Sequence, residues 1–300
     1  MLANATRHVS RARRLVHLLG HNPEYVLGRF AAVRDAYSTL RSLGDAVAAD
    51  ASLRIGDLYE EAVIPLAVTS SGYLVPQKPV DAQVADLRER SHSVGPHIAP
   101  DIARDLQRQC RTLPLKVAGH AAGNYEELAK TSERYEQIAI ATVIDSSKLA
   151  VVQALAADPM LHDAASSFLG YRARRVSSWL FWSFASQLSD AERRAMNQTI
   201  DFHYDVDGYN FMYANFYLVD TTTENGAHVL IEGSSRRKRW RHLMGIARLS
   251  DAEALAAYGE TAERVMEGPA GFGFLEDSSC YHKALPPRGG DRLILQLRYR

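Results

Sequence analysis

Three side chains in the C-terminal third of this chain have the types and spacing of a metal site. His203 and Asp205 are two residues apart, so both side chains would point to the same face of an extended strand. His282 follows about eighty residues later and would add a third ligand from another strand. Two imidazoles and one carboxylate on one side of a metal suit iron(II), and they leave its other side open for a chelating cosubstrate and dioxygen.

An arginine ten residues after the second histidine extends this pattern. Arg292 can make a paired, charge-assisted contact with a carboxylate, so we expect it to anchor the far end of a dicarboxylate cosubstrate. Two other arginines are rivals for this role. Arg288 lies in a Pro-Pro-Arg-Gly-Gly loop, which is less rigid, and Arg298 lies farther along the strand that begins at Arg292.

The spacing of His203 and Asp205 is weak evidence on its own. With 11 His and 35 acidic residues, chance gives about one His-x-acid triplet in 300 residues, and this chain has one. The metal hypothesis therefore depends on what surrounds the triplet.

Composition argues against several classes of protein. The formal net charge of zero disfavours a nucleic-acid partner, and no apolar run approaches the roughly eighteen residues of a transmembrane helix. Two cysteines, Cys110 and Cys280, do not make a disulfide framework, so we expect a reducing, cytoplasmic location. Cys280 could line the pocket, but we expect a small buried residue.

The arginines near the N-terminus leave an alternative open. Arg7, Arg11, Arg13 and Arg14 precede only a short apolar stretch, which argues against a secretory signal. A basic segment that touches an anionic membrane surface and an ordinary helix with a solvated basic face both fit this pattern.

The first two-thirds of the chain is predicted to be mostly helical. Asn22 and Pro23 are typical of a helix start, and apolar residues recur at helical spacing from there to Gly44. A capping box that begins at Ser189 predicts a short helix just before the metal motif. Further helices are expected at about 81–90, 101–112, 124–140 and 158–169.

After residue 200 the pattern changes to that of β-strands. Strands are predicted at 211–219, 229–231, 271–275 and 292–299, and Asn225-Gly226 indicates a hairpin between the first two. We therefore expect an α+β protein with a double-stranded β-helix core, a jelly-roll or cupin-like fold, under an extensive N-terminal helical layer. The last strand would turn one face to a polar cavity and the other to helices, and the cavity face consists of Arg292, Ile294, Gln296 and Arg298.

Taken in order, these motifs resemble the phytanoyl-CoA dioxygenase family of iron(II)/2-oxoglutarate-dependent oxygenases. The resemblance is carried by Phe202–Gly208, by Phe216–Ser234 with its Glu-Asn-Gly, and by the ending from Gly271 to Tyr299. Upstream, 71–76 and 156–170 are similar to the first strand of that family's catalytic region and to its helix before the metal strand. The resemblance covers roughly residues 66–300 and leaves residues 1–65 outside it as an N-terminal helical extension.

Membership of this family would give each candidate residue a role. The catalytic iron(II) would be held by His203, Asp205 and His282. Arg292 would bind 2-oxoglutarate, whose keto acid end chelates the metal, and Asn215 falls where many relatives place a cosubstrate-contacting residue. The implied reaction consumes dioxygen, releases succinate and carbon dioxide, and most often hydroxylates a small organic substrate. Natural-product intermediates, glycan or lipid precursors and acyl intermediates all fit.

The chain departs from the family in one place and leaves two other functions open. Relatives often have Gly-Ser-His where this chain has Gly233-Ser234-Ser235, and we expect this departure to affect the substrate side. Related halogenases replace the carboxylate ligand with a small residue, so Asp205 disfavours halogenation. A jelly-roll metal enzyme without 2-oxoglutarate, such as an isomerase, would not need Arg292. A non-catalytic binding protein would be expected to lose a metal ligand.

The basic run from Arg236 to Arg241 has two interpretations. It could bind a phosphate or carboxylate near the site entrance, or it could be a solvated charged loop, which we favour. The sequence does not predict the oligomeric state.

Overall fold

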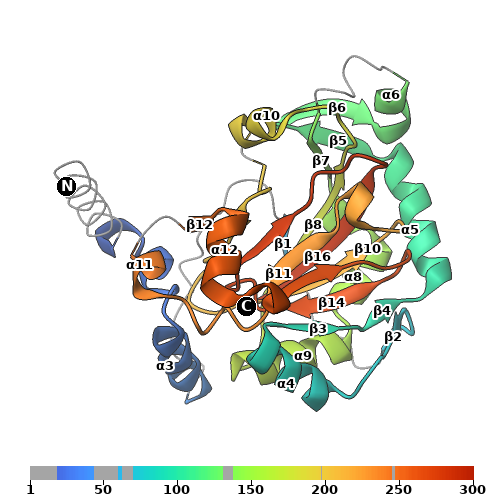
Figure 1. Ribbon diagram of the computed structural model, residues 1–300. Coiled ribbons are helices and arrows are strands. Elements are labelled where there is room, and N and C mark those ends of the chain that lie inside the picture. The colour runs from blue at the N-terminus through green and yellow to red at the C-terminus, as the bar shows by residue number, and fades with distance from the viewer. Residues whose placement is uncertain (1–18, 44–59, 63–69, 131–137, 197, 245–246) are drawn as a thin grey trace.

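The computed structural model describes residues 19–43, 60–62, 70–130, 138–196, 198–244 and 247–300 (Figure 1). Within these ranges the α-helices are α2 (Pro23–Leu27), α3 (Ala31–Ser42), α4 (Val80–Arg90), α5 (Pro100–Thr112), α6 (Tyr125–Ala129), α8 (Ala150–Ala156), α9 (Pro159–Leu169), α10 (Asp190–Ala195), α11 (Trp240–Leu243) and α12 (Asp251–Tyr258). None of the helices described is long and apolar enough to cross a membrane.

Two large antiparallel sheets make the β part of this mixed fold. The order in the larger sheet is β3 (His92–Val94), β14 (Gly273–Glu276), β10 (Met212–Tyr217), β16 (Arg292–Tyr299), β8 (Val176–Ser183), β7 (Ile140–Val143), β5 (Pro114–Val117) and β6 (His120–Asn124), with β1 (Glu60–Ala62) also paired to β8. The order in the smaller sheet is β12 (Arg248–Leu249), β9 (Phe202–His203), β15 (His282–Ala284), β11 (His228–Ile231) and β13 (Glu263–Met266). A separate pair consists of β2 (Leu74–Val75) and β4 (His97–Ile98).

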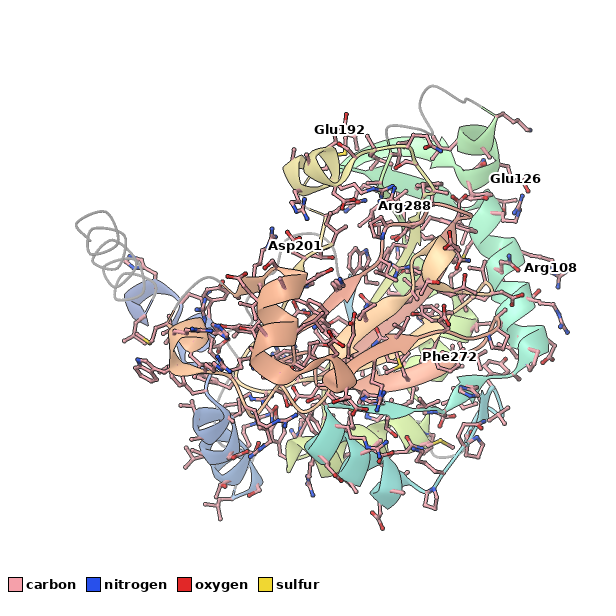
Figure 2. The ribbon with its side chains drawn as sticks, in the orientation of Figure 1. Arg108, Glu126, Glu192, Asp201, Phe272 and Arg288 are labelled. Carbon is pink, nitrogen blue, oxygen red and sulfur yellow. The ribbon has the colours of Figure 1, made fainter. Side chains whose placement is uncertain are left out.

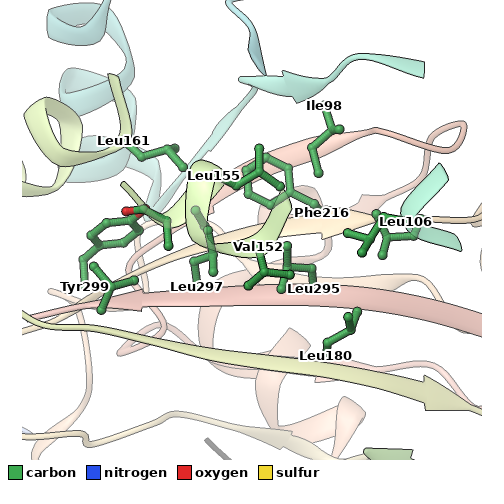
Figure 3. Packing of buried hydrophobic residues seen from close by; sticks show 14 of the residues in the cluster. Ile98, Leu106, Val152, Leu155, Leu161, Leu180, Phe216, Leu295, Leu297 and Tyr299 are labelled. Atoms are coloured by element: carbon green, nitrogen blue, oxygen red, sulfur yellow. The ribbon is translucent and has the colours of Figure 1, made fainter. Parts of the chain in front are cut away.

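Strand β16 lies between β10 and β8 and separates the core from the interior cavity. It pairs with β8 along its whole length, from Arg292 opposite Ser183 to Tyr299 opposite Val176. Its apolar face packs under α5, α8 and α9 in the main hydrophobic core, which includes Leu106, Val152, Leu155, Leu161, Leu295, Leu297 and Tyr299 (Figure 3). The predicted division of this strand is confirmed for Arg292, Ile294 and Gln296, which line the cavity, whereas Arg298 is buried beside Asp207 and does not reach it.

The two sheets enclose a cavity of about 640 Å³. Its walls come from both of them: Phe181 and Ile294 belong to the larger sheet, and His203, His228 and His282 to the smaller one. Because the helices cover the other face of the larger sheet, the cavity side is left for a binding site.

The prediction that the first two-thirds of the chain is mostly helical is wrong in part, because β3 and β5 to β8 lie within it. The most informative of these is β8, in which every residue is buried except the half-buried Trp179. A strand that is buried on both faces lacks the alternation of apolar and polar residues by which strands are found.

Four of the predicted helices are confirmed as α4, α5, α9 and α10, but two are not. The helix predicted from Asn22 to Gly44 is split between Leu27 and Ala31. The chain leaves the helical path at Phe30, which is extended. At Gly28, the C-cap of α2, a Cβ atom would lie 2.6 Å from the Gly208 carbonyl oxygen, so this close approach requires glycine. Of the helix predicted at 124–140, the described residues contain α6, residues 131–137 lie outside the described residues, and β7 begins at Ile140.

The hairpin predicted at Asn225-Gly226 is wrong. Strand β10 pairs with β14 and β16, whereas β11 pairs with β13 and β15, so the turn carries the chain from one sheet to the other. The Asn225 side chain accepts from the Thr222 backbone N–H and donates to the Asp220 carbonyl oxygen, which closes a turn of 3-10 helix. Gly226 then takes a left-handed conformation with φ of 94° and turns the chain into β11.

Packing of β16 against the helices generates a prediction. Leu295→Ala should lower the free energy of unfolding by about 3 kcal/mol, because the residue is fully buried and the helices cannot collapse into the space left. Leu43→Ala is the matched control, since Leu43 is 79% exposed and should change the free energy by less than about 0.5 kcal/mol. Urea unfolding measures both, and equal costs would contradict this account of the core.

Candidate metal centre and its cavity

Two neighbouring strands of the smaller sheet and a loop bring the predicted metal ligands together. His203 on β9 stands directly opposite His282 on β15 in the strand register. Asp205 follows β9, and its backbone N–H donates to the Ser278 carbonyl oxygen at 2.9 Å. The three side chains offer ligand atoms that all lie within 4.8 Å of one another, as a shared metal requires.

Hydrogen bonds to the backbone orient both imidazoles. His203 Nδ1 lies 3.1 Å from the Asp201 carbonyl oxygen, and His282 Nδ1 lies 3.1 Å from that of Cys280. A carbonyl oxygen only accepts, so each Nδ1 carries the proton and each Nε2 keeps a lone pair. The Nε2 atoms of His203 and His282 lie 3.8 and 3.6 Å from the two carboxylate oxygens of Asp205. Both lone pairs therefore face the position a metal would take.

Burial sets the charge states of these ligands. It lowers the pKa of His203 to about 4, with a further contribution from the adjacent His282 ring, and it also lowers the pKa of His282 to about 4. Burial raises the pKa of Asp205. At neutral pH both imidazoles are uncharged and able to bind a metal. A divalent cation between them would stabilise the carboxylate that burial disfavours, so the donor set fits such an ion.

Arg292 lies on the cavity wall with its side chain almost completely buried, at 4% exposure. It donates to the Gly226 carbonyl oxygen and to Ser183 Oγ, but its Nε has no partner. Burial lowers its pKa, and the Tyr217 hydroxyl offsets this in part. Among the residues that the structure describes, no carboxylate forms an ion pair with Arg292. A buried cation without a counter-charge in a cavity is a site for an anionic ligand.

The two rival arginines already have partners and do not line the cavity. Arg288 lies near α10 and makes an exposed ion pair with Asp190 at 3.2 Å (Figure 2). Arg298 is buried, but its guanidinium is paired with Asp207 and also donates to Ser177 Oγ. The basic run from Arg236 to Arg241 also contributes nothing to the cavity wall.

Asn215 is brought near the site but does not reach the cavity wall. Its side chain is fully buried on β10, where Nδ2 donates to Glu276 Oε2 at 3.2 Å and Oδ1 accepts from Gln296 Nε2 at 2.8 Å. Both partners line the cavity, so Asn215 holds wall residues in place. Cys280, likewise, is fully buried and does not line the cavity.

Sequence reasoning missed two polar residues beside the metal ligands. His228 and Glu276 line the cavity, with His228 Nε2 3.0 Å from Glu276 Oε1, and the His228 ring stacks 5.2 Å from that of His282. Burial alone would raise the pKa of Glu276, but His228 and His282 hold it well below its usual range, so this carboxylate is charged. The available signal was a polar residue in each of two apolar strands, His228-Val-Leu-Ile and Gly-Phe-Leu-Glu276.

A buried ion pair connects α3 to the loop between β14 and β15. Arg34 Nη1 donates to Asp277 Oδ1 at 2.8 Å and to Ser279 Oγ at 2.7 Å, and Arg34 and Asp277 are 3% and 2% exposed. Burial alone would raise the pKa of Asp277, but the Arg34 guanidinium holds it below its usual range. The same loop supplies the Ser278 carbonyl oxygen that receives the Asp205 backbone N–H. Arg34 therefore fixes a loop that supports a metal ligand.

Comparison with known proteins gives structural likenesses only. No family model matches the chain, and no curated protein matches it. Solved structures of α-ketoglutarate-dependent enzymes do match. EvdO2 from Micromonospora carbonacea var. aurantiaca, complexed with 2-oxoglutarate, is 14% identical with a TM-score of 0.49, over 75% of this chain and 92% of that one.

A second match is the non-haem α-ketoglutarate-dependent epimerase SnoN from nogalamycin biosynthesis, 15% identical with a TM-score of 0.47 over 74% of this chain and 82% of that one. SnoN has also been solved with Fe3+ and α-ketoglutarate. The carbocyclase SnoK from the same biosynthesis is 11% identical with a TM-score of 0.44, over 75% and 86% of the two chains. At TM-scores below 0.5 these likenesses assign this chain no reaction.

The ligand geometry predicts the effect of removing each ligand. His203→Ala, Asp205→Ala and His282→Ala should each weaken iron(II) binding by more than about a hundredfold, because three ligands are few and each supplies a direct bond. His120→Ala is the matched control, since His120 lies exposed on β6. Metal analysis after anaerobic reconstitution measures the occupancy, and full iron content in all three variants would place the metal elsewhere.

The Arg34–Asp277 pair predicts a large cost of truncating one partner. Arg34→Leu should lower the free energy of unfolding by about 3–5 kcal/mol, because it leaves the Asp277 carboxylate buried and unpaired. Arg236→Leu is the control, since Arg236 pairs with Asp35 of the same helix at an exposed position and should cost less than about 1 kcal/mol. Urea unfolding compares them, and Arg34→Leu with Asp277→Leu together should recover much of the loss. Similar costs for the two single variants would contradict the importance of burial.

Proposed function

We propose that this protein is an iron(II)/2-oxoglutarate-dependent oxygenase that oxidises a small organic molecule. One observation carries the proposal: the buried guanidinium of Arg292, which pairs with no carboxylate of the described residues, lines the same cavity as the three candidate metal ligands. An isomerase that binds only a metal would not need this cation, and neither would a protein without a ligand.

The proposed role of each residue follows from its position in the cavity. His203, Asp205 and His282 would hold iron(II), which when bound supplies the activation of dioxygen and the oxidation of a substrate C–H bond. Arg292 binds the far carboxylate of 2-oxoglutarate and directs the keto acid end toward the metal ligands. The apolar walls keep water from the reacting groups, which strengthens the ionic contacts within the cavity.

The finer assignments belong to the same proposal. We place residues 66–300 in a phytanoyl-CoA dioxygenase-like catalytic region with a double-stranded β-helix core, which the two facing antiparallel sheets support. Hydroxylation with release of succinate is the reaction we favour, because Asp205 occupies the ligand position that a halide would need. Asn215 would affect cosubstrate binding only indirectly, because it holds Glu276 and Gln296 of the cavity wall in place.

The assignment of Arg292 makes a prediction about cosubstrate affinity. Arg292→Leu should raise the dissociation constant for 2-oxoglutarate by about a hundredfold or more, because a desolvated charge-assisted contact is lost, while the iron content stays near that of the wild type. Arg292→Lys should recover only part of the affinity, since an ammonium cannot form the paired contact. Anaerobic titration follows the visible absorption of iron(II) chelated by a keto acid and needs no substrate.

Arg288→Leu is the matched control and should bind 2-oxoglutarate as the wild type does, because its guanidinium lies outside the cavity. An effect in Arg288→Leu that is missing in Arg292→Leu would overturn the assignment of the anchor. An iron-loaded wild type that shows no keto acid absorption and no succinate release would favour the metal enzyme without 2-oxoglutarate.

A further inference from the structure

The cavity continues past the metal ligands and Arg292 along the inner face of β7 and β8. Ile140 and Thr142 of β7 and Trp179 and Phe181 of β8 form this part of the wall. None of these four side chains is charged, although Lys116 of β5, the register partner of Thr142, also lines the cavity. The surface formed by β7 and β8 is therefore suited to a mainly apolar portion of a ligand.

The side chain of Trp179 is held in a fixed orientation. Its indole N–H donates to Thr142 Oγ1 at 3.0 Å, and its ring stacks on that of Phe181 with centroids 3.8 Å apart and an interplanar angle of 23°. The hydrogen bond satisfies the polar atom of the indole, and the stack fixes the plane of its ring. A flat aromatic surface is thus prepared before any ligand binds.

Trp179 is also the residue of β8 that is not fully covered. The other seven residues of this eight-residue strand are buried, whereas Trp179 is half-buried and lines the cavity. Trp182, three residues later, is 1% exposed and stacks on Tyr125 in the core on the other face of the sheet, with centroids 4.0 Å apart. Of these two tryptophans, only Trp179 offers surface that a bound molecule could cover.

A hydrogen-bond acceptor lies beside this aromatic surface. Gln296 of β16 is the register partner of Trp179 and lines the cavity. Asn215 donates to Glu276 Oε2 through Nδ2 and accepts from Gln296 Nε2 through Oδ1. This sequence of bonds determines the orientation of the Gln296 amide. Its oxygen, Oε1, takes no part in this sequence of bonds, and Gln296 itself lines the cavity.

We propose that this part of the cavity binds a planar, mainly apolar ring system that stacks on Trp179 and donates a hydroxyl or N–H group to Gln296. The ring system is the substrate class of the oxygenase, so to that extent the inference rests on the proposed function. An acyl chain, which the resemblance to the phytanoyl-CoA dioxygenase family would suggest, has no flat face and gains nothing from a fixed stacking surface.

Calorimetric titration of the full-length protein with three alcohols tests the inference. The probes are 2-naphthol, which is flat, decahydro-2-naphthol, which has the same skeleton but is not flat, and the linear 1-decanol. We expect 2-naphthol to bind at least about tenfold more tightly than either saturated alcohol, because only a flat ring can use the stacking surface. Equal or tighter binding of a saturated alcohol, or no binding of 2-naphthol, would overturn the proposal.

Variants locate the binding surface. Trp179→Ala should weaken 2-naphthol binding at least about tenfold, and Trp179→Leu should weaken it comparably, since leucine restores apolar volume without a flat face. Trp240→Ala, the same substitution at a position 67% exposed on α11, should bind as the wild type does. Unchanged binding in both Trp179 variants contradicts the proposal, and thermal unfolding of Trp179→Leu shows that the fold is retained.

Two further measurements separate this inference from the proposed function. Gln296→Leu should weaken binding of 2-naphthol but leave that of 2-methoxynaphthalene, which has no donor, within about twofold. The second measurement is an anaerobic titration with 2-naphthol in the absence and in the presence of iron(II) and 2-oxoglutarate. If 2-naphthol binds in a Trp179-dependent way but 2-oxoglutarate does not bind, the ring-binding surface is supported and the oxygenase proposal is contradicted. If 2-oxoglutarate binds but 2-naphthol does not, the oxygenase proposal is supported and the ring-binding surface is contradicted.

Discussion

Charged groups held out of water between two sheets are the constraint on which the rest of this structure depends. Arg292, Asp205 and Glu276 face one interior cavity, and each ionised form is costly there unless a partner offsets its charge. Glu276 finds partners in the chain, in His228 and Asn215, but Arg292 finds no carboxylate among the residues described. A cation between the imidazoles and a dicarboxylate beside the arginine would complete the charge balance. Under the proposed function, iron(II) and 2-oxoglutarate would supply the charges that the described residues leave unbalanced.

The larger sheet keeps these charges apart from the hydrophobic core. Strand β16 turns leucines toward α5, α8 and α9 and presents Arg292, Ile294 and Gln296 to the cavity. Because side chains alternate along this strand, one side of the sheet faces the hydrophobic core and the other faces the cavity. A single-residue slip of register would place the guanidinium in the core, so the continuous pairing with β8 protects both stability and the site.

Residues with a fixed local geometry could be predicted from the sequence. The two-residue spacing of His203 and Asp205 and the alternation after Arg292 are properties of an extended chain, and the structure brings those residues to one cavity. The hairpin at Asn225-Gly226 was wrong, and the mostly helical prediction for the first two-thirds was wrong in part, because pairing partners are set by the whole sheet. His228 and Glu276 could not be found by spacing, since they meet only where β11 and β14 come together. Strand β8 is buried on both faces and so lacks the alternation of apolar and polar residues that predicts a strand, although tryptophan and valine are common in strands.

The Arg34–Asp277 pair has a consequence for where this protein can be divided. The resemblance places the catalytic region at residues 66–300, yet the guanidinium that neutralises Asp277 comes from α3, well before that boundary. A recombinant fragment that began at residue 66 would keep every metal ligand and lose the counter-ion beneath them. Asp277 in the loop between β14 and β15 would then lose its ion-pair partner and keep only the longer-range charge of Lys238, in a largely desolvated position. The shortest fragment that folds stably is therefore expected to be longer than the one that sequence resemblance outlines.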